Sequence, residues 1–398
     1  MTLDDADSGR SAPDAVQPHL RVCIVQQVIP TYRVAVFNAL GSSHGIDLSV
    51  WAERSFPGVK PTDPTTYTSF AYRATKVRHL GPFIVQPDQL AAAAADFDVV
   101  VYSWNTRFAY LIPALLRARR RGIGSVVWGH GVSPDDTSAR RALRDRVGTL
   151  ADARLLYSEA VAEDIRTRSA KPDSVFVAPN AIDQEQVRVA SDRWRDSSKL
   201  DDFRVKVGLA GTNLFVALSR LRPEKKLSDL IRAVASLRSE GRAVHLAVIG
   251  DGIEMASLEE LAVSLGIADC VQFLGGLYDE EELAPWCLSA VACVVPASIG
   301  LSLLHAFGYA LPVITTSDEQ TPEIEALRNG ENGILVKSQG VDGLVSAMRS
   351  LLDDSGTRGR MATAAAATVG EDGFGIPQMV DGMIQAIRYA ARVRRSGL

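Results

Sequence analysis

The sequence predicts an α/β protein built from two parallel-sheet domains that face each other across a cleft. Short apolar runs rich in Val, Ile and Phe recur along the chain and alternate with longer segments of helical periodicity. Continuous apolar runs between helices are typical of parallel strands buried on both faces. The length of 398 residues suits two cores rather than one. Because such sheets bind ligands beyond the carboxyl ends of their strands, we expect the functional site there.

The chain is expected to divide into a tail and two domains. Residues 1–18 are acidic, polar and Pro-containing, and they predict a disordered tail. The first domain is expected at residues 19–190, with strands at RVCIVQQ, IDLSVWA, DVVVYSW, GSVVWGH, ARLLYSE and SVFVAP. After the charged stretch QEQVRVASDRWRDSSKLDD, the second is expected at residues 203–375, with strands at NLFVALSR, HLAVIGDG, CVQFLGG, AVACVVP, LPVITT and GILV. Residues 376–398 show helical spacing and a basic end, and we expect this helix to pack back on the first domain.

Composition excludes several classes of function. The 43 basic and 47 acidic residues give a net charge of -4, so nucleic acid is not an expected partner. The cysteines form no CxxC pair and are typical of buried thiols in a reducing compartment. No apolar run approaches the roughly 18 residues that cross a bilayer, and no segment resembles a signal peptide. We therefore expect a cytoplasmic protein.

The segment SRLRPEKKLSDLI, residues 219–231, carries the first candidate site. A predicted strand ends at Ser219, and Arg220 and Lys225 flank a Pro-containing turn before the next helix. Two cations at the carboxyl end of a strand indicate an anionic ligand. The alternative is that both are solvated charges of an ordinary turn.

Two glycine turns extend this site. In VIGDGIEM, Gly250 lies between a predicted strand and a predicted helix, as in a nucleotide-binding loop. The third glycine of a dinucleotide fingerprint is missing, so NAD is disfavoured as a ligand. A plain tight turn is the alternative. In ASIGLSLLHAF, Gly300 permits close backbone approach, and the N–H groups of Leu301 and Ser302 would be unpaired at a helix start. A diphosphate would fit there.

Two histidines complete the candidates. His305 lies five residues beyond Gly300, just over one helical turn, so it can face the same pocket. A hydrogen-bonded core His is the alternative. In VVWGHGVS, His130 stands between two glycines directly after a predicted strand, which would expose the imidazole between the domains. A structural His in a turn is the alternative.

Together these segments resemble the family 4 glycosyltransferases, which have the GT-B fold of two facing Rossmann-like domains. SRLRPEKKLSDLI is similar to the family's donor-binding segment GRLxPEKxxxxLI, and the resemblance continues through VIGDGIEMASLEELAVSLGIADCVQFLGG, PASIGLSLLHAFGYALPVITT and TPEIEALRNGENGILV. It covers almost all of residues 213–336 in the family's order. In the first domain, IPTYRVAVFNAL, WGHG, ADARLLYSE and VFVAPNAID also look like this family.

The resemblance implies a glycosyltransferase that moves a sugar from a UDP- or GDP-sugar to a glycan, a polyprenyl-linked or a small-molecule acceptor. It implies retention of anomeric configuration, with no metal and no other cofactor. His130, Arg220 and Lys225 become the catalytic candidates, the imidazole beside the transferred sugar and the two cations on the diphosphate. The implied donor-binding positions are Gly250, Phe273, Gly275, Gly300, Leu301, Ser302, His305 and Glu323. Tyr32 and Arg33, expected in the loop after the first strand, are candidates for contact with the acceptor or with a phosphate.

The sequence departs from the family's two-glutamate motif, in which two Glu bracket seven residues. Ala297 stands at the first position and His305 at the second, as in a bacterial subset with His there. In the family the second Glu contacts the donor ribose, and an imidazole can make a comparable hydrogen bond. The first contacts the transferred sugar, which Ala297 cannot do. Two alternatives therefore stay open, a non-catalytic nucleotide-sugar-binding partner and a GT-B-fold nucleotide-sugar epimerase.

Basic residues beside apolar stripes suggest a membrane surface as a further partner. TRFAYLIPALLRARRRGIG and SARRALRDRVG contribute arginines that could rest on anionic lipid at the inner face of the cell membrane, namely Arg117, Arg119, Arg120, Arg121, Arg140, Arg141, Arg144 and Arg146. The alternative is solvated helix faces paired with Asp135, Asp136 and Asp145.

Overall fold

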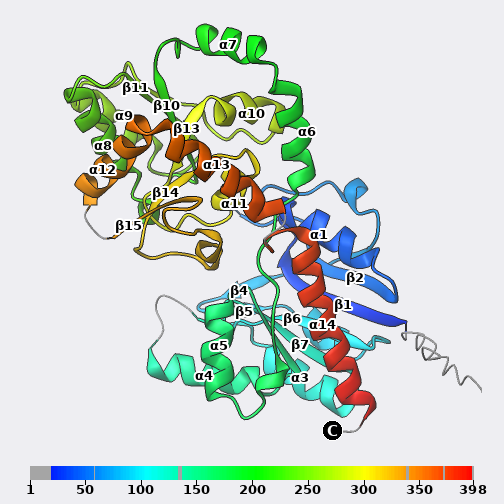
Figure 1. The fold of residues 1–398 in the computed structure, drawn as a ribbon. Coiled ribbons are helices and arrows are strands. Elements are labelled where there is room, and N and C mark those ends of the chain that lie inside the picture. The colour runs from blue at the N-terminus through cyan, green and yellow to red at the C-terminus, as the bar shows by residue number, and fades with distance from the viewer. Residues whose placement is uncertain (1–18, 58, 133–136, 338–339, 371–372, 397–398) are drawn as a thin grey trace, which may run out of the picture.

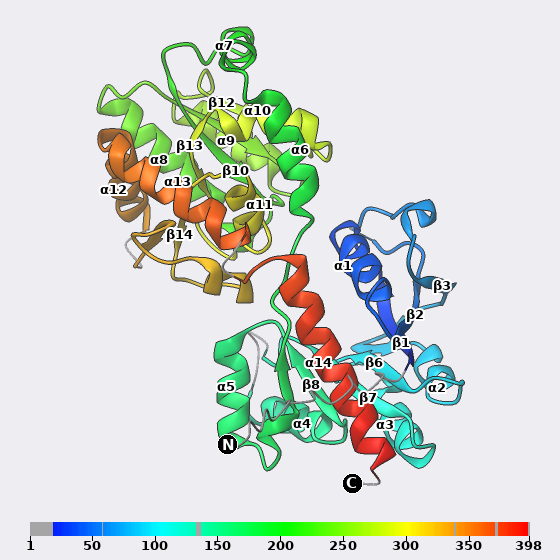
Figure 2. The ribbon, with the colours of Figure 1, turned by 45° about the vertical axis from the view of Figure 1, so that its right-hand side comes forward.

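The computed structural model describes residues 19–57, 59–132, 137–337, 340–370 and 373–396. Its ribbon falls into two lobes, joined by the chain near residue 180 and by the last helix (Figures 1 and 2). The prediction of a disordered tail at residues 1–18 lies outside the described residues.

The first lobe is built on a parallel sheet. Within the described residues its order is β3-β2-β1-β6-β7-β8-β9. The bounds are β1 Leu20–Val28, β2 Ile46–Glu53, β3 Ala71–Ala74, β6 Val99–Ser103, β7 Gly124–Gly129, β8 Ala153–Leu156 and β9 Val175–Val177. A short antiparallel hairpin, β4 Arg78–Leu80 with β5 Phe83–Val85, stands apart from it. The apolar runs therefore form buried parallel strands, as the lack of alternation predicts.

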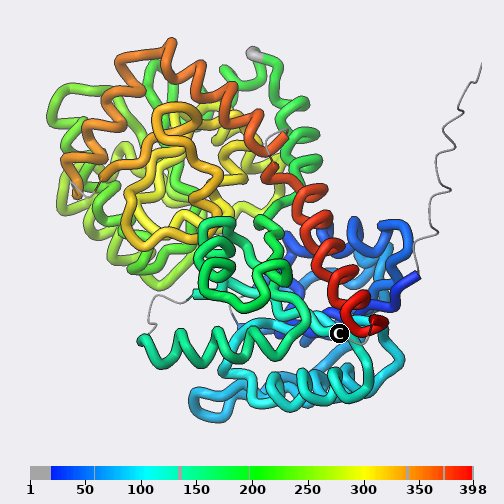
Figure 3. The backbone as a smooth tube through the Cα atoms, turned by 60° about the horizontal axis from the view of Figure 1, so that its bottom comes forward, coloured from blue at the N-terminus to red at the C-terminus, as the bar shows by residue number. Residues whose placement is uncertain are grey.

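Helices cover both faces of this sheet. The first-lobe helices are α1 Thr31–Gly41, α2 Asp88–Ala92, α3 Leu111–Arg120, α4 Ser138–Gly148, α5 Glu159–Arg168 and the 3-10 turns η1 Pro64–Thr66 and η2 Pro172–Ser174. The last helix, α14 Ile376–Arg395, returns from the second lobe and runs along α1, β7, β8 and β9 (Figures 1 and 3). Its Gly382 lies so close to β9 that a Cβ would stand 1.9 Å from the Val177 carbonyl oxygen. Near its end, Arg394 pairs with the buried Asp152.

The second lobe contains a parallel sheet in the order β12-β11-β10-β13-β14-β15. The bounds are β10 Asn213–Leu218, β11 Val244–Ile249, β12 Val271–Phe273, β13 Ala290–Val294, β14 Val313–Thr316 and β15 Gly333–Val336. Its helices are α8 Leu227–Ser239, α9 Met255–Ser264, α10 Glu280–Leu288, α11 Ser302–Gly308, α12 Gly340–Asp353 and α13 Ser355–Gly370, with the 3-10 turns η3 Pro223–Lys225 and η4 Pro322–Ala326. Two apolar clusters, one on each face of the sheet, form its core.

The charged stretch expected between the domains is helical. It forms α6 Gln184–Trp194 and α7 Ser197–Lys206. The side chain of Asp183 caps α6, and that of Asp196 caps α7. Because α6 packs against α10 and α11, it lies with the second lobe. The expected domain limits stay a prediction.

Candidate functional site

The carboxyl edge of the second sheet gathers most of the predicted donor residues. Because the strands are parallel, the segments after β10, β11, β12, β13 and β14 all leave the sheet at the same edge. Gly250 donates its N–H to the Gly275 carbonyl at 2.7 Å, which joins the turns after β11 and β12. A Cβ at Gly250, whose φ is 145°, would stand 1.9 Å from the Ser219 carbonyl oxygen. Only glycine fits this approach.

Lys225 connects two loops at this edge of the sheet. One is the cation turn, residues 219–226 between β10 and α8, and the other is the Gly300 loop, residues 295–301 between β13 and α11. Lys225 ends η3, is 8 % exposed, and donates an ammonium hydrogen bond to the Ser298 carbonyl. Burial lowers the pKa of Lys225, and the nearby Arg220 lowers it further, while Glu224 and Glu323 oppose the shift. Among the described residues, neither Lys225 nor Arg220 forms an ion pair with a carboxylate. Both cations can therefore still form direct ion pairs with an anionic ligand.

The Gly300 loop has an unusual backbone. Ser298 has φ 49° and Gly300 has φ 64°. The N–H of Gly300 donates to the Thr321 hydroxyl at 3.0 Å, whereas no acceptor for the N–H of Leu301 or Ser302 is found in the described part of the chain. The helix that follows, α11, has only seven residues. Its dipole is correspondingly short, so Lys225 is the stronger element of the site.

His305 has a partner that sequence reasoning missed. Its Nε2 lies 3.0 Å from Oε2 of Glu280, the first residue of α10, and its ring stacks on Tyr309. Tyr309 also donates its hydroxyl to the same carboxylate. Burial raises the pKa of Glu280, but the hydrogen bonds and charge of His305 and the bond from Tyr309 outweigh it and hold the pKa below its ordinary value. The imidazole is therefore held in place by a carboxylate from another helix.

The first lobe presents His130 after β7, as predicted. Its ring lies 4.9 Å from that of Tyr157, measured between centroids. Burial lowers the pKa of His130; Glu323 of the second lobe acts to raise it and Arg33 to lower it. Both flanking glycines are tightly packed: a Cβ at Gly131 would meet Leu156 at 2.6 Å. The structure thus places His130 in the field of a second-lobe carboxylate.

Arg33 lies in a helix rather than in the loop where it was expected. Tyr32 and Arg33 belong to the first turn of α1, and Arg33 is 3 % exposed. Its guanidinium donates to Asn180 Oδ1 at 2.5 Å and lies 4.7 Å from the ring centroid of Trp128. Asn180 donates in turn to Oε1 of Glu323. Arg33 is therefore a buried support for Asn180, while Tyr32 remains 37 % exposed.

Much of the second lobe is similar to a known protein family. Residues 200–368 match the family model described as "Glycosyl transferases group 1". Residues 200–368 are therefore similar to the group 1 glycosyl transferases. The matched residues include the cation turn, the glycine turns, His305 and Glu323, whereas His130 and Arg33 lie outside them.

Similarity to known proteins extends beyond the residues that match the family model. The chain is 27% identical, over 84% of its own length and 88% of the relative's, to a GDP-mannose-dependent alpha-(1-6)-phosphatidylinositol monomannoside mannosyltransferase of Mycolicibacterium smegmatis. It is 29% identical over 59% of its length, and 54% of the relative's, to a D-inositol 3-phosphate glycosyltransferase of Streptomyces scabiei. The predicted glycosyltransferase class is confirmed at this level.

A solved structure supports the fold. The crystal structure of Anabaena Alr3699/HepE in complex with UDP superposes with a TM-score of 0.71 over 93% of this chain and 99% of that one, at 17% identity. At such low identity the likeness shows the fold alone. The predicted GT-B architecture is confirmed.

Proposed function

We propose that this protein transfers a sugar from a UDP- or GDP-sugar to a glycan, lipid-linked or small-molecule acceptor, with retention of configuration and without a metal ion. The observation that carries the proposal is the bond from the buried Lys225 ammonium to the Ser298 carbonyl. It places an unneutralised cation beside the Gly300 loop, where a diphosphate would accept its remaining hydrogen bonds. A cation there also stabilises the charge that grows on the leaving nucleotide.

The rest of the site is assigned around this diphosphate. Arg220 would share it with Lys225, and the turns at Gly250 and Phe273–Gly275 would border the nucleoside. His305, fixed by Glu280, would contact the ribose through its other ring nitrogen. Glu323 would stand between the donor and His130, and the exposed ring of Tyr32 would contact the acceptor. The relatives' printed names support a GDP-sugar and an inositol-containing acceptor, and the UDP complex supports the other nucleotide.

The missing glutamates leave the two alternatives to be tested directly. Ala297 is fully buried and offers nothing to a sugar. The purified protein should be incubated with UDP- and GDP-sugars, with and without a lipid extract. Product that forms only when acceptor is present supports the transferase. Isomerised donor without acceptor would show an epimerase, and binding without turnover would show a non-catalytic partner.

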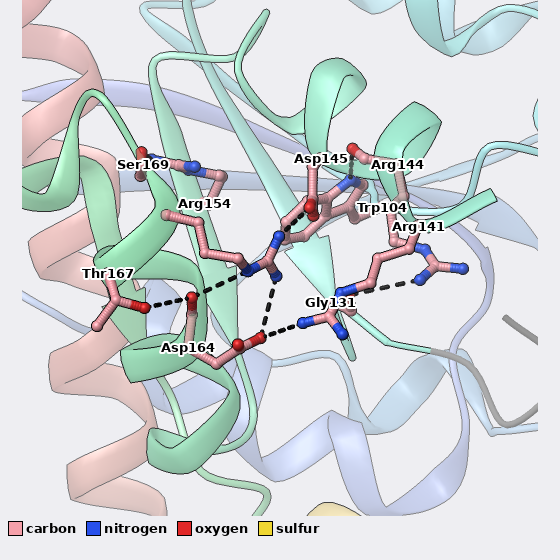
Figure 4. A network of polar contacts seen from close by, with 10 residues as sticks. Trp104, Gly131, Arg141, Arg144, Asp145, Arg154, Asp164, Thr167 and Ser169 are labelled. Atoms are coloured by element: carbon pink, nitrogen blue, oxygen red, sulfur yellow. Dashed lines mark hydrogen bonds and ion pairs between the residues drawn. The ribbon is translucent and has the colours of Figure 1, made fainter. Parts of the chain in front are cut away.

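We also propose a peripheral membrane surface, centred on α3 rather than on α4. In α4, Arg141 pairs with Asp164 of α5 at 2.5 Å (Figure 4), and Arg144 donates to the Gly131 carbonyl at 3.4 Å. Asp145 of the same helix pairs with Arg168 of α5. Asp135 and Asp136 lie outside the described residues. The exposed α3 arginines, by contrast, stand beside Ile112 and Leu116, which are 41 % and 38 % exposed. Among the described residues, no helix has the length and apolar character to cross a membrane.

Changing Arg117, Arg119 and Arg120 to Gln should reduce binding to anionic vesicles by about tenfold or more, because each basic residue near such a surface contributes about 1 kcal/mol. Liposome flotation at low salt would measure this. The matched control neutralises three arginines of the second lobe, Arg188, Arg193 and Arg195, and should leave binding unchanged. Equal binding of the native protein to neutral and anionic vesicles would remove the proposal.

A further inference from the structure

The 3-10 turn η4 belongs to the second lobe and carries two carboxylates, those of Glu323 and Glu325. Both accept hydrogen bonds from residues outside the second lobe's sheet, Glu323 from Asn180 and Glu325 from Ser158. Glu325 reaches the start of α5 in the first lobe. Its Oε1 accepts from the Ser158 hydroxyl at 2.5 Å and from the N–H of Ala160 at 3.0 Å, and its Oε2 accepts from the N–H of Glu159 at 2.9 Å. One carboxylate thus takes three hydrogen bonds from the opposite lobe.

These bonds complete the cap of α5. Ser158 is the N-cap residue, and its hydroxyl oxygen accepts from the N–H of Val161. The N–H groups of Glu159 and Ala160 have no partner within their own helix, since such groups lack an acceptor in the first turn. Glu325 supplies both acceptors, and its negative charge is favoured at the positive end of a helix dipole. The first lobe therefore depends on the second for a complete helix start.

The same turn is tied to the proposed donor site. Thr321, the residue before η4, accepts the N–H of Gly300 at 3.0 Å. Glu323, 6 % exposed, accepts from Asn180 and acts electrostatically on both Lys225 and His130. Only five residues span η4, with Pro322 at its start. The Gly300 loop and the start of α5 are therefore linked by one short segment.

The first-lobe end of this link lies next to His130. Ser158 directly follows Tyr157, whose ring packs against the His130 ring. A shift of Ser158 would thus move the residue that supports the imidazole. We infer that Glu325 is a positioning residue, which holds the first lobe, and with it His130, in register with the donor site. This inference rests on the proposed function.

The first test replaces Glu325 by Ala and by Gln. Glu325→Ala should lower kcat/KM for the acceptor about tenfold or more, since a displacement of about 1 Å between reacting groups can cost a hundredfold. Nucleotide affinity, measured by calorimetry, should stay within about twofold, because Glu325 is not placed on the donor. Glu325→Gln should restore part of the activity, since its amide oxygen still accepts. The matched control is Glu240→Gln, which changes an ion pair with Arg349 inside the second lobe.

The second test measures the distance between labels in the two lobes, and it does not depend on sugar transfer. The cysteines at 23, 270, 287 and 293 are buried, so labels can be directed to cysteines introduced at the exposed positions Leu143 and Ile253, one in each lobe. Glu325→Ala should broaden the distance distribution between these labels, and Glu240→Gln should not. An unchanged distribution together with undiminished transfer would overturn the inference. Failure of the native protein to bind any nucleotide would overturn the proposed function instead, while a broadened distribution would still support the positioning contact.

Discussion

Lys225→Ala should lower the kcat for sugar transfer by about a hundredfold or more while the protein stays folded. The lost contact is a charge-assisted hydrogen bond to a diphosphate whose charge grows as the sugar leaves, and a hundredfold corresponds to about 2.7 kcal/mol. Lys225 is buried but pairs only with a carbonyl in the described structure, so its removal leaves no carboxylate unpaired. Steady-state kinetics with a saturating sugar nucleotide would measure the change.

The adjacent Lys226 provides the control. It pairs with Asp318 at 3.5 Å and remains more than a third exposed, so it is placed at the surface. Lys226→Ala should change kcat by less than about threefold, in line with the small contribution of exposed ion pairs. Normal turnover in Lys225→Ala would mean that the anion site lies elsewhere.

Gly382→Val should destabilise the first lobe by about 3 kcal/mol or more. A Cβ at this position would stand 1.9 Å from the Val177 carbonyl oxygen, an atom of the strand backbone that cannot rotate away. The clash would lift α14 from β7, β8 and β9 and disturb the apolar cluster that contains Met379, Met383 and Ile387. Denaturant unfolding followed by circular dichroism would measure the loss.

A second helix glycine makes the matched comparison. Gly359 in α13 has no neighbour within 4 Å of the position a Cβ would take. Gly359→Ala should therefore be neutral or stabilising by up to about 1 kcal/mol, because Ala favours helix more than Gly does. If Gly382→Val unfolds like the native protein, α14 does not pack on β9 as described.

The fold was largely predictable because its signals are local. Apolar runs mark the strands, and the glycine at 250 marks a turn that no larger residue fits. The helices over residues 184–206 were missed because their charged composition hides an apolar side that meets α10. Asp183 and Asp196 cap the starts of these two helices, and they were the signal in the sequence that could have predicted them.

The places of the candidate residues were predictable where those residues follow a strand, as His130 follows β7 of the first sheet and Gly250 follows β11 of the second. Arg220, Gly250 and Gly300 share an edge by topology alone. The hydrogen-bond partners of His305 and Ser158 were not predictable, because they lie far away in the sequence. Glu280 is 25 residues from His305, and Glu325 is 167 residues from Ser158. Residues 279–282 are all acidic, and nothing in the sequence indicates that Glu280, rather than its neighbours in this run, bonds to the imidazole of His305.

We propose that Arg220, Lys225 and the Gly300 loop hold one nucleoside diphosphate. Calorimetric titration of UDP and GDP into the native protein and into the Arg220→Ala/Lys225→Ala double variant tests it most directly. We expect one nucleotide to bind the native protein and the double variant to bind it at least about a hundredfold more weakly, since each charged contact contributes about 1.5 to 3 kcal/mol. Equal affinity of both proteins for that nucleotide would contradict it.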